Sequence, residues 1–424
     1  MERVVNQNAY QTWFKEFYGA SGQNLQNVKV PLASMLLKNA RADWVGDQFV
    51  APLRFDVATG LGFRAQGQAL PQAGAALRDR ALFRAAKAYG VAEYEREVIV
   101  QSRNDKGAFA KATVDEAQAV VEGFQMHMIE RPLFGSGTGV LGEIDDASIT
   151  GAGTSVSPWV FDLATSPTAG TTPVGKVRYF AQGARLDLYT AAGVYQMTIK
   201  VVSATRNSTT GVVTLSATTV STGSATSPTD DDLIYWEGNK DNECVGLAQI
   251  APSAAGTLYG LSQTTYPKMK GLYVPISGAI AYDDVNNTVS QLEEECGESP
   301  TIGITSHRAL AMLKNQAEEA KRYNFAEAKS SGALVGFKGL EIMSDEGAFP
   351  LVASQMCPDD EIYLFRKEHM QIVLRQDFGW FDEDGAVLRR KEGFDRYIAE
   401  YGGYFQLFCA KPNSVARIKG FSLL

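Results

Sequence analysis

Apolar residues recur at three- and four-residue steps between residues 113 and 131, and this spacing predicts a helix with one apolar face. The face consists of Val114, Ala117, Val120, Val121, Phe124 and Met128. A capping box, Thr113-Val-Asp-Glu116, predicts where the helix begins, and Arg131-Pro132 predicts where it ends. At about 1.5 Å per residue, such a helix is a rod roughly 30 Å long, which can brace an elongated molecule.

The first 50 residues contain too few apolar residues for a core of their own. An aromatic cluster is followed by a stretch rich in Gly, Asn and Gln, and then by Pro31-Leu-Ala-Ser-Met-Leu-Leu-Lys38. The cluster consists of Tyr10, Trp13, Phe14, Phe17 and Tyr18. We therefore expect residues 1–50 to form an arm that lies along the rest of this subunit or along a neighbour.

Residues 51–112 mix short extended runs with glycine and proline, which favours a long two-stranded excursion. The candidate extended runs are 63–70 and 82–100. Two interpretations stay open in the second run, because Ala81–Ala88 has helix propensity whereas Tyr94–Val100 alternates in the manner of a strand.

Two stretches rich in Ser, Thr and Gly follow the predicted helix and are almost free of charge. Asp162 is the only charged residue between Ala147 and Gly175, and residues 207–229 contain none. Strand-like runs occur at 178–190, 194–205, 211–218 and 232–237. An inserted small β-barrel or β-sandwich over residues 146–245 accounts for this pattern.

Beyond Gly246 the pattern becomes mixed α and β, so the chain as a whole is expected to have an α+β fold. Residues 283–295 and 306–322 are predicted helices, and the apolar Ile302-Gly-Ile304 precedes the second, which indicates a strand–loop–helix domain over 246–350. Residues 351–424 return to strands, at 361–374, 387–390 and 397–410, with Asp382-Glu-Asp-Gly385 as a turn between two of them.

Composition narrows the function classes. The 424 residues carry 40 Lys and Arg against 48 Asp and Glu, a net charge of −8 that disfavours tight binding of DNA. The densest basic cluster, Arg389-Arg-Lys391, is followed by Glu392 and is better explained as a hairpin edge. No signal peptide or membrane-spanning run is visible, so the protein is expected to be made in the cytoplasm. Cys244, Cys296, Cys357 and Cys409 are too far apart for a metal site and are expected to be buried free thiols.

The glycine-rich motifs do not fit nucleotide binding. Gly137-Thr-Gly-Val-Leu-Gly142 has the spacing of a dinucleotide fingerprint, but it follows a predicted helix and opens none, so a corner between elements is the better interpretation. Gly170-Thr-Thr-Pro-Val-Gly-Lys176 resembles a phosphate loop, but Val177 replaces the required hydroxyl residue and Pro173 removes a cradling amide.

Other candidate chemistry is equally sparse. His127, His307 and His369 occur singly, and a packing role for His127 outweighs a ligand role. The acidic runs Asp230–Asp232 and Asp382–Asp384 lack the spacing of a calcium loop and are expected to be solvated turns. The sequence therefore predicts no catalytic residue, no cofactor and no metal ligand, and it favours a structural protein over an enzyme.

The order of these segments resembles the major capsid proteins of tailed bacteriophages with the Hong Kong 97 fold. Gly46-Asp-Gln-Phe-Val-Ala-Pro52 is similar to the family's entry into its extended loop. The segments Gly336–Asp345 and Met356-Cys-Pro-Asp-Asp-Glu-Ile-Tyr-Leu364 resemble its passage from axial to peripheral domain. Phe378-Gly-Trp380 and Asp395–Phe405, with Lys411-Pro412, resemble its closing strands.

The resemblance implies a division of the chain and a set of partners. The domains would be an N-terminal arm (1–50), an extended loop (51–112), a spine helix with the start of the peripheral domain (113–145), an inserted all-β domain (146–245), an axial domain (246–350) and return strands of the peripheral domain (351–424). It further implies pentamers and hexamers in an icosahedral shell around double-stranded DNA, bound without sequence specificity. Portal, scaffolding or decoration proteins would be its partners, and the virion capsid its final location.

Two alternatives remain open. An encapsulin-type compartment would share the fold and differ mainly in its cargo. A β-rich carbohydrate-binding protein or enzyme would instead use aromatic residues as stacking platforms, although such residues are more often part of a β-domain core. The candidate platforms are Trp159, Tyr189, Tyr195 and Trp236.

Overall fold

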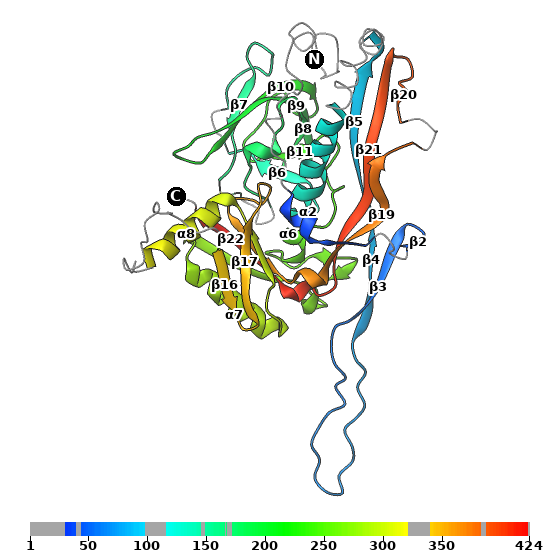
Figure 1. The fold of residues 1–424 in the computed structure, drawn as a ribbon, viewed down its shortest axis with the longest axis vertical. Coiled ribbons are helices and arrows are strands. Elements are labelled where there is room, and N and C mark those ends of the chain that lie inside the picture. The colour runs from blue at the N-terminus through cyan, green and yellow to red at the C-terminus, as the bar shows by residue number, and fades with distance from the viewer. Residues whose placement is uncertain are drawn as a thin grey trace, which may run out of the picture.

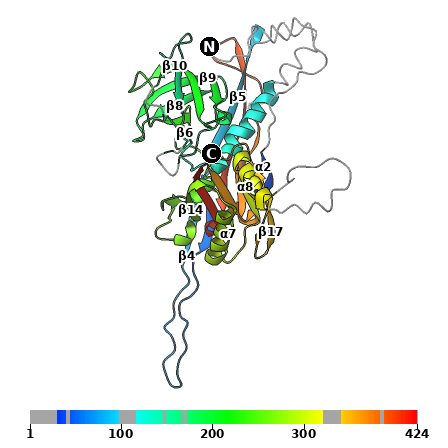
Figure 2. The same cartoon turned by 90° about the vertical axis from the view of Figure 1, so that its left-hand side faces the viewer.

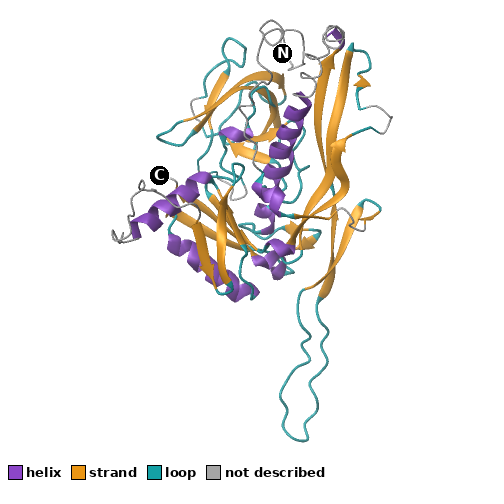
Figure 3. Ribbon diagram, viewed as in Figure 1, coloured by secondary structure: helices purple, strands orange, loops and turns teal. Residues whose placement is uncertain are grey.

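The computed structural model describes residues 30–39, 44–97, 116–145, 149–165, 167, 172–320, 340–382 and 387–422. This part has an α+β fold with many strands and few helices (Figures 1 and 3). A long helix lies between a barrel of strands and a sheet of long strands, a third sheet with two helices lies below the barrel, and a narrow hairpin projects from the base. Seen from the side, the hairpin extends away from every other element (Figure 2). None of the described helices has the length and apolar character that a membrane span requires.

The long helix is described from Glu116, so the rest of its predicted capping box lies outside the described residues. Its predicted end at Arg131-Pro132 is wrong, because the helix continues through α5 (Arg131–Phe134) with Pro132 in the first turn. The preceding segment, η2 (Gln125–Glu130), is π-helical. Its hydrogen bonds span five residues instead of four, and this wider turn gives room for the proline ring that would clash with a regular α-helical turn.

One face of the helix packs against the long-stranded sheet. The ring of Phe124 lies 5.0 Å from that of Tyr401 in an edge-to-face contact. The sheet has the order β1-β19-β21-β20, with β5 also paired to β21. The strands are β1 (Leu37–Asn39), β5 (Ala86–Glu95), β19 (Met370–Trp380), β20 (Arg389–Arg390) and β21 (Arg396–Cys409). The pairing of β20 with β21 confirms that the basic run at 389–391 begins at a hairpin edge.

The arm prediction can be followed only at its end, because residues 1–29 lie outside the described residues. The short helix α2 (Pro31–Met35) and β1 lie along this subunit's own sheet, where β1 runs parallel to β19. The buried carboxylate of Glu130 accepts hydrogen bonds from the backbone N–H groups of Leu32 and Ala33, at 3.1 and 2.8 Å. The long helix thus holds the first turn of α2 in place.

The hairpin consists of β3 (Gln48–Arg54) and β4 (Arg78–Arg84), with the short β2 (Trp44–Val45) beside β3. Its two-stranded character agrees with the prediction, but the predicted extended run at 63–70 is wrong, because those residues lie in the loop that joins β3 and β4. The helical interpretation of Ala81–Ala88 is wrong, because these residues belong to β4 and β5. Each of these strands pairs with a partner distant in sequence or across the hairpin, and this pairing overrides the local helix propensity.

The barrel is a six-stranded sheet of order β6-β11-β8-β9-β10-β7. Its strands are β6 (Val140–Glu143), β7 (Trp159–Asp162), β8 (Arg185–Tyr189), β9 (Tyr195–Arg206), β10 (Val213–Thr222) and β11 (Leu233–Trp236), with the short turn η3 (Val177–Tyr179) before β8. The two edges meet, because Ile144 bridges Leu163 and the N–H of Ala164 bonds to the carbonyl of Glu143 at 2.9 Å. Fully buried side chains fill the interior, among them Phe161, Leu186, Leu188, Met197, Ile199 and Leu215.

The third sheet has the order β14-β22-β18-β15-β17-β16 and its own apolar core. Its strands are β14 (Leu272–Ala279), β15 (Ile302–Thr305), β16 (Leu340–Ser344), β17 (Gly347–Ala353), β18 (Glu361–Phe365) and β22 (Val415–Ser422). The helices α7 (Tyr282–Cys296) and α8 (His307–Ala320) pack on it, close to their predicted positions. Short elements complete the fold: α6 (Leu247–Ile250), β12 (Thr257–Leu258), β13 (Leu261–Ser262), η4 (Pro267–Met269), η6 (Lys367–His369) and η7 (Pro412–Ser414).

Candidate functional site

The loop at the end of the hairpin, residues 55–77, exposes apolar side chains to solvent. Phe63 is fully exposed, and Leu61 and Leu70 are exposed by 81% and 86%. Val57 and Leu77 are exposed as well. A soluble monomer gains nothing from several apolar side chains held on one projecting loop, so this hairpin loop is a candidate interaction surface.

The base of the hairpin is fixed by aromatic packing. The ring of Phe83 on β4 lies 4.9 Å from Phe49 on β3 and 5.5 Å from Phe408 on β21. The hydroxyl of Tyr266 donates a hydrogen bond of 2.6 Å to Asp79 near the start of β4. The hairpin is therefore anchored at one end, and its apolar loop projects from a rigid support.

A second candidate site lies where the barrel meets the third sheet, at the consecutive acids Asp359, Asp360 and Glu361. All three are buried, and Glu361 is 1% exposed. Its Oε1 lies 2.5 Å from Nη2 of Arg417 and 3.3 Å from Nζ of Lys419. Both cations come from β22, which pairs with β18 in antiparallel register. Burial alone raises the pKa of Glu361, but Arg417 and Lys419 outweigh it and hold the pKa below its ordinary value.

Asp359 connects the same segment to the barrel. Its Oδ1 lies 3.0 Å from Nζ of Lys176, and its Oδ2 lies 3.0 Å from Nη2 of Arg206 at the end of β9. Lys419 reaches the barrel side too, because its ammonium donates a 2.6 Å hydrogen bond to the carbonyl of Thr172. We call this set of acids and cations the ionic junction: Asp359, Asp360, Glu361, Lys176, Arg206, Arg417 and Lys419.

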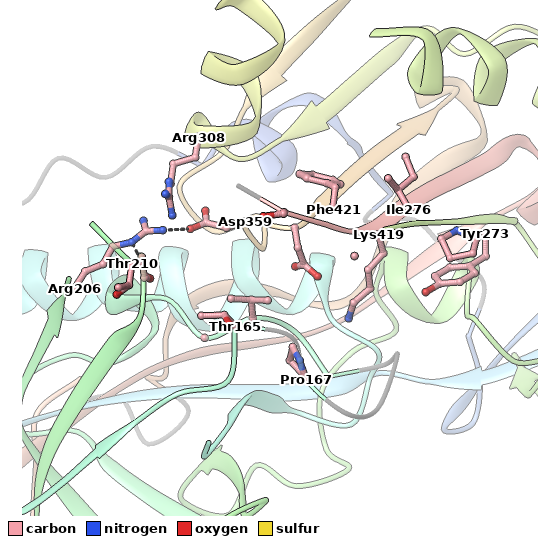
Figure 4. Close-up of a pocket in the computed structure, with 17 residues that line it drawn as sticks. Thr165, Pro167, Arg206, Thr210, Tyr273, Ile276, Arg308, Asp359, Lys419 and Phe421 are labelled. Atoms are coloured by element: carbon pink, nitrogen blue, oxygen red, sulfur yellow. Dashed lines mark hydrogen bonds and ion pairs between the residues drawn. The ribbon is translucent and has the colours of Figure 1, made fainter. Parts of the chain in front are cut away.

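Beside the ionic junction lies a cavity of about 400 Å³. Figure 4 shows Arg206 from the barrel and Arg308 from α8 reaching toward Asp359 from different sides, with Lys419 and Tyr273 farther along the wall. Asp360 lines the cavity as well, and its Oδ1 has no hydrogen-bond partner among the described residues. Burial, followed by the charge of Glu361, raises the pKa of Asp360 to about 7.

The histidines lie apart from one another, as their spacing predicts. His127 is buried on the long helix, 5.2 Å from the ring of Trp236, and burial lowers its pKa to about 4. His369 contacts Ser414 and Glu298, at 3.1 and 3.2 Å, and His307 begins α8. No group of three or more metal-ligating side chains occurs among the described residues.

The remaining sequence candidates have structural roles. Gly137–Gly142 leads from the long helix into β6, as predicted for a corner. Lys176, the last residue of the motif that resembles a phosphate loop, forms an ion pair with Asp359. Part of this motif, residues 170 and 171, lies outside the described residues. Asp230–Asp232 forms a turn, but Asp232 is buried, not solvated, and accepts the N–H of Thr229 at 2.9 Å. Most of Asp382–Asp384 lies outside the described residues.

The cysteines are free thiols as predicted; Cys244, Cys357 and Cys409 are buried, while Cys296 is only partly so. The four aromatic residues considered for carbohydrate stacking are divided among separate contacts. Tyr189 and Tyr195 meet edge to face at 5.5 Å, Trp159 donates to Thr219, and Trp236 packs on His127. Such contacts are typical of packing residues and offer no shared flat face.

The sequence analysis missed the ionic junction, although a signal was present. Arg417 and Lys419 lie two residues apart within an otherwise apolar strand, which places both on one face. Two cations on one buried face require buried acids opposite them, and Asp359-Asp-Glu361 directly precedes a run of buried apolar residues.

No protein-family description and no curated protein matches the sequence. The fold, in contrast, matches solved capsid structures. A chain of the cyanophage A-1(L) capsid asymmetric unit aligns over 98% of this chain and 99% of that chain, with a TM-score of 0.57 and 12% identity. A chain of the capsid of the native GTA particle aligns over 99% and 100%, with a TM-score of 0.50 and 10% identity. The chain therefore has the fold of these capsid subunits over essentially its full length.

An encapsulin also aligns, but more weakly. The holo-SrpI encapsulin complex from Synechococcus elongatus PCC 7942 covers 99% of this chain and 96% of that chain, with a TM-score of 0.42 and 8% identity. A score at this level does not bear on the choice between a phage shell and a cellular compartment.

Proposed function

We propose that this chain is the major capsid protein of a tailed bacteriophage, a structural subunit that assembles with copies of itself into the icosahedral shell around double-stranded DNA. The observation that carries the proposal is the alignment of the whole chain with a capsid subunit of cyanophage A-1(L). The absence of recognisable catalytic chemistry in the sequence agrees with a structural role, and the proposed subunit is not an enzyme.

The Hong Kong 97 domain scheme belongs to this proposal. The arm would span 1–50, the extended loop 51–112, the spine helix and the start of the peripheral domain 113–145, the inserted all-β domain 146–245, the axial domain 246–350 and the return strands 351–424. The closed barrel supports an inserted unit, with β6 as its first strand. Because β18 and β22 pair within the sheet of β14 and β15, the proposed axial domain draws two strands from the last range.

In this proposal the hairpin loop docks on a neighbouring subunit. Complete burial of one large apolar side chain contributes about 1.5–3 kcal/mol, and Leu61, Phe63 and Leu70 are each available for such burial. Pentamers and hexamers multiply the contact over the whole shell, so each contact need not be strong by itself. The arm with Trp13, Phe14, Phe17 and Tyr18 lies outside the described residues, and its overlap with a neighbour stays a prediction.

The proposed surroundings follow from the same role. The subunits would assemble in the host cytoplasm, with portal and with scaffolding or decoration proteins as partners. A net charge of −8 supports a shell that encloses DNA without binding it tightly.

Electron microscopy of the purified chain tests the proposal directly. We expect closed shells or rings of five and six subunits, whereas a monomer under all assembly conditions would contradict it. A triple variant, Leu61→Ser with Phe63→Ser and Leu70→Ser, should remain folded by circular dichroism but form no shells. The matched control, Val156→Ser with Val194→Ser and Met343→Ser, removes exposed apolar side chains elsewhere and should assemble normally. DNA-filled particles isolated from phage would separate this function from an encapsulin-type compartment.

A further inference from the structure

The cavity beside the ionic junction lies between two parts of the fold. The barrel contributes Arg206 and the β9–β10 loop, and the third sheet contributes Tyr273 and Lys419, while Arg308 comes from the first turn of α8. Whatever occupies this cavity touches the barrel and the third sheet at once.

The cations around the cavity outnumber the acids. Lys176 and Arg206 each take one oxygen of Asp359, at 3.0 Å in both cases. Arg308 adds a third positive charge near the same carboxylate and has no ion-pair or hydrogen-bond partner of its own among the described residues. Among the side chains that line the cavity, Arg206, Arg308 and Lys419 give three cations against the two acids Asp359 and Asp360, in a chain whose overall charge is negative.

The guanidinium groups of Arg206 and Arg308 converge at Gly211. A Cβ atom on Gly211 would lie 2.8 Å from Nη1 of Arg308 and 3.6 Å from Nη2 of Arg206. Gly211 has a φ of +78°, which favours glycine, and the missing side chain leaves room for both arginines. Burial, followed by the charge of Arg206, lowers the pKa of Arg308, and the nearby carboxylate of Asp359 offsets only part of this effect.

We propose that the cavity binds a tetrahedral oxyanion of the phosphate class between Arg206 and Arg308. The planar guanidinium group presents parallel N–H donors that match two oxygens of such an anion, and two arginines can hold it from both sides. The hydroxyl of Thr210 and the carboxyl of Asp360 also line the cavity and add hydrogen-bonding groups. The bound anion would join the β9–β10 loop to the start of α8 and so fix the barrel against the third sheet. The site is independent of the proposed shell function.

Titration of the purified subunit with inorganic phosphate tests the site, with KCl used to keep the ionic strength constant. We expect saturable binding of one phosphate per subunit by calorimetry, and a thermal unfolding midpoint that keeps rising with the logarithm of the phosphate concentration above the Kd. Arg308→Gln should weaken binding at least about tenfold, because two charge-assisted hydrogen bonds are lost. Among the described residues Arg308 makes no hydrogen bond or ion pair, and Asp359 keeps Lys176 and Arg206 as its direct partners, so this variant should fold normally. Lys367→Gln removes one exposed cation elsewhere and should bind like the original protein.

Two results would overturn the site: no saturable phosphate binding above that of chloride, or equal binding by Arg308→Gln. Competition between phosphate and a short duplex DNA identifies the source of the oxyanion. Displacement of phosphate by the duplex would assign a DNA phosphodiester, and persistence of phosphate binding would assign a free ion.

Sulfate keeps its charge between pH 6 and pH 8 and therefore reports on the protein alone. Protonation of Asp360 removes a negative charge from the wall and supplies a donor, so sulfate should bind more tightly at pH 6 than at pH 8. Asp360→Asn should abolish this difference, and an unchanged pH dependence in that variant would remove Asp360 from the site. The charged and titratable groups that face Asp360 or share its cavity are Glu361, Lys419, Arg417, Asp359, Arg206, Arg308 and Tyr273.

Discussion

Folded proteins usually bury apolar side chains and expose charged ones, and the hairpin loop and the ionic junction each depart from this rule in a different way. The loop holds apolar side chains in solvent, with Phe63 fully exposed, whereas the junction buries charges, with Glu361 and Arg417 at 1% exposure each. Apolar side chains stabilise a protein only when they are removed from water, so the exposed loop indicates a partner outside the subunit. Burying a charge destabilises the folded subunit unless an opposite charge lies beside it, so the junction depends on contacts made within the subunit.

The comparison separates two kinds of stability. Substitutions in the junction should change the unfolding of one subunit, and substitutions in the loop should change the association of many. The following experiments test that separation, beginning with the largest expected effect.

Glu361→Gln should lower the free energy of unfolding of the subunit by about 3–5 kcal/mol, because it leaves Arg417 buried without a full counter-charge. Urea denaturation followed by circular dichroism measures this change. Glu341→Gln alters an exposed acid on β16 and serves as the control, with an expected change within about 0.5 kcal/mol. Equal stability of the two variants would show that the junction is not structural.

Asp360 should make the subunit less stable as the pH rises. Its folded-state pKa lies above the ordinary value of 3.8, so its stabilisation is fully present below that value and is lost as the pH rises through about 7. The full shift corresponds to roughly 4 kcal/mol, of which roughly 2–3 kcal/mol falls between pH 5 and pH 8. Unfolding free energies of the original protein and of Asp360→Asn, measured between pH 5 and pH 8, should differ by this pH-dependent amount.

His127 also titrates in the folded subunit, so the pH dependence of Asp360 can be measured only by comparing the original protein with Asp360→Asn. Its pKa is lowered from 6.5 to about 4 by burial, with Arg131 and Arg178 adding to the shift, so its stabilisation is lost as the pH falls through this interval. The two groups therefore act in opposite directions, and only the difference between the two proteins isolates Asp360. Parallel pH curves for both would contradict the assignment.

Phe63→Ser should leave the unfolding of the subunit unchanged and weaken assembly by about 1.5–3 kcal/mol per subunit, because the side chain is exposed before association and buried afterwards. The critical concentration for shell formation, followed by light scattering, measures the loss. If Phe63→Ser instead lowered the stability of the subunit and left assembly normal, the loop would be shown to stabilise the subunit and not its association.

Asp47→Asn should have the smallest effect, within about 0.5 kcal/mol in unfolding. Asp47 pairs with Arg84 near the base of the hairpin at 2.9 Å, but the two side chains are 57% and 71% exposed. The distance resembles that of the junction pairs, so this variant and Glu361→Gln compare similar chemistry at two levels of burial. A large loss with Asp47→Asn would show that burial is not the deciding variable.

Elements with a strong local period were predictable. The helices near 283–295 and 306–322, the apolar strand at 302–304 and the strands between 178 and 237 all lie close to their expected positions. In each case the residues of the element itself show the alternation of apolar and polar positions that predicts it. The failures came where a distant partner decides, as at Ala81–Ala88, where strand pairing overrides helix propensity.

The sequence by itself determined the α+β character of the chain, its β-rich middle and the absence of recognisable catalytic motifs, because these depend on composition and on periods of a few residues. Only the tertiary structure decided that a π-helical segment carries the helix past Pro132, that the barrel closes and that the apolar loop projects into solvent. It also brought Asp359, Asp360 and Glu361 together with cations from the barrel and from β22. Their pairing depends on three-dimensional distance and burial, which a linear pattern does not contain.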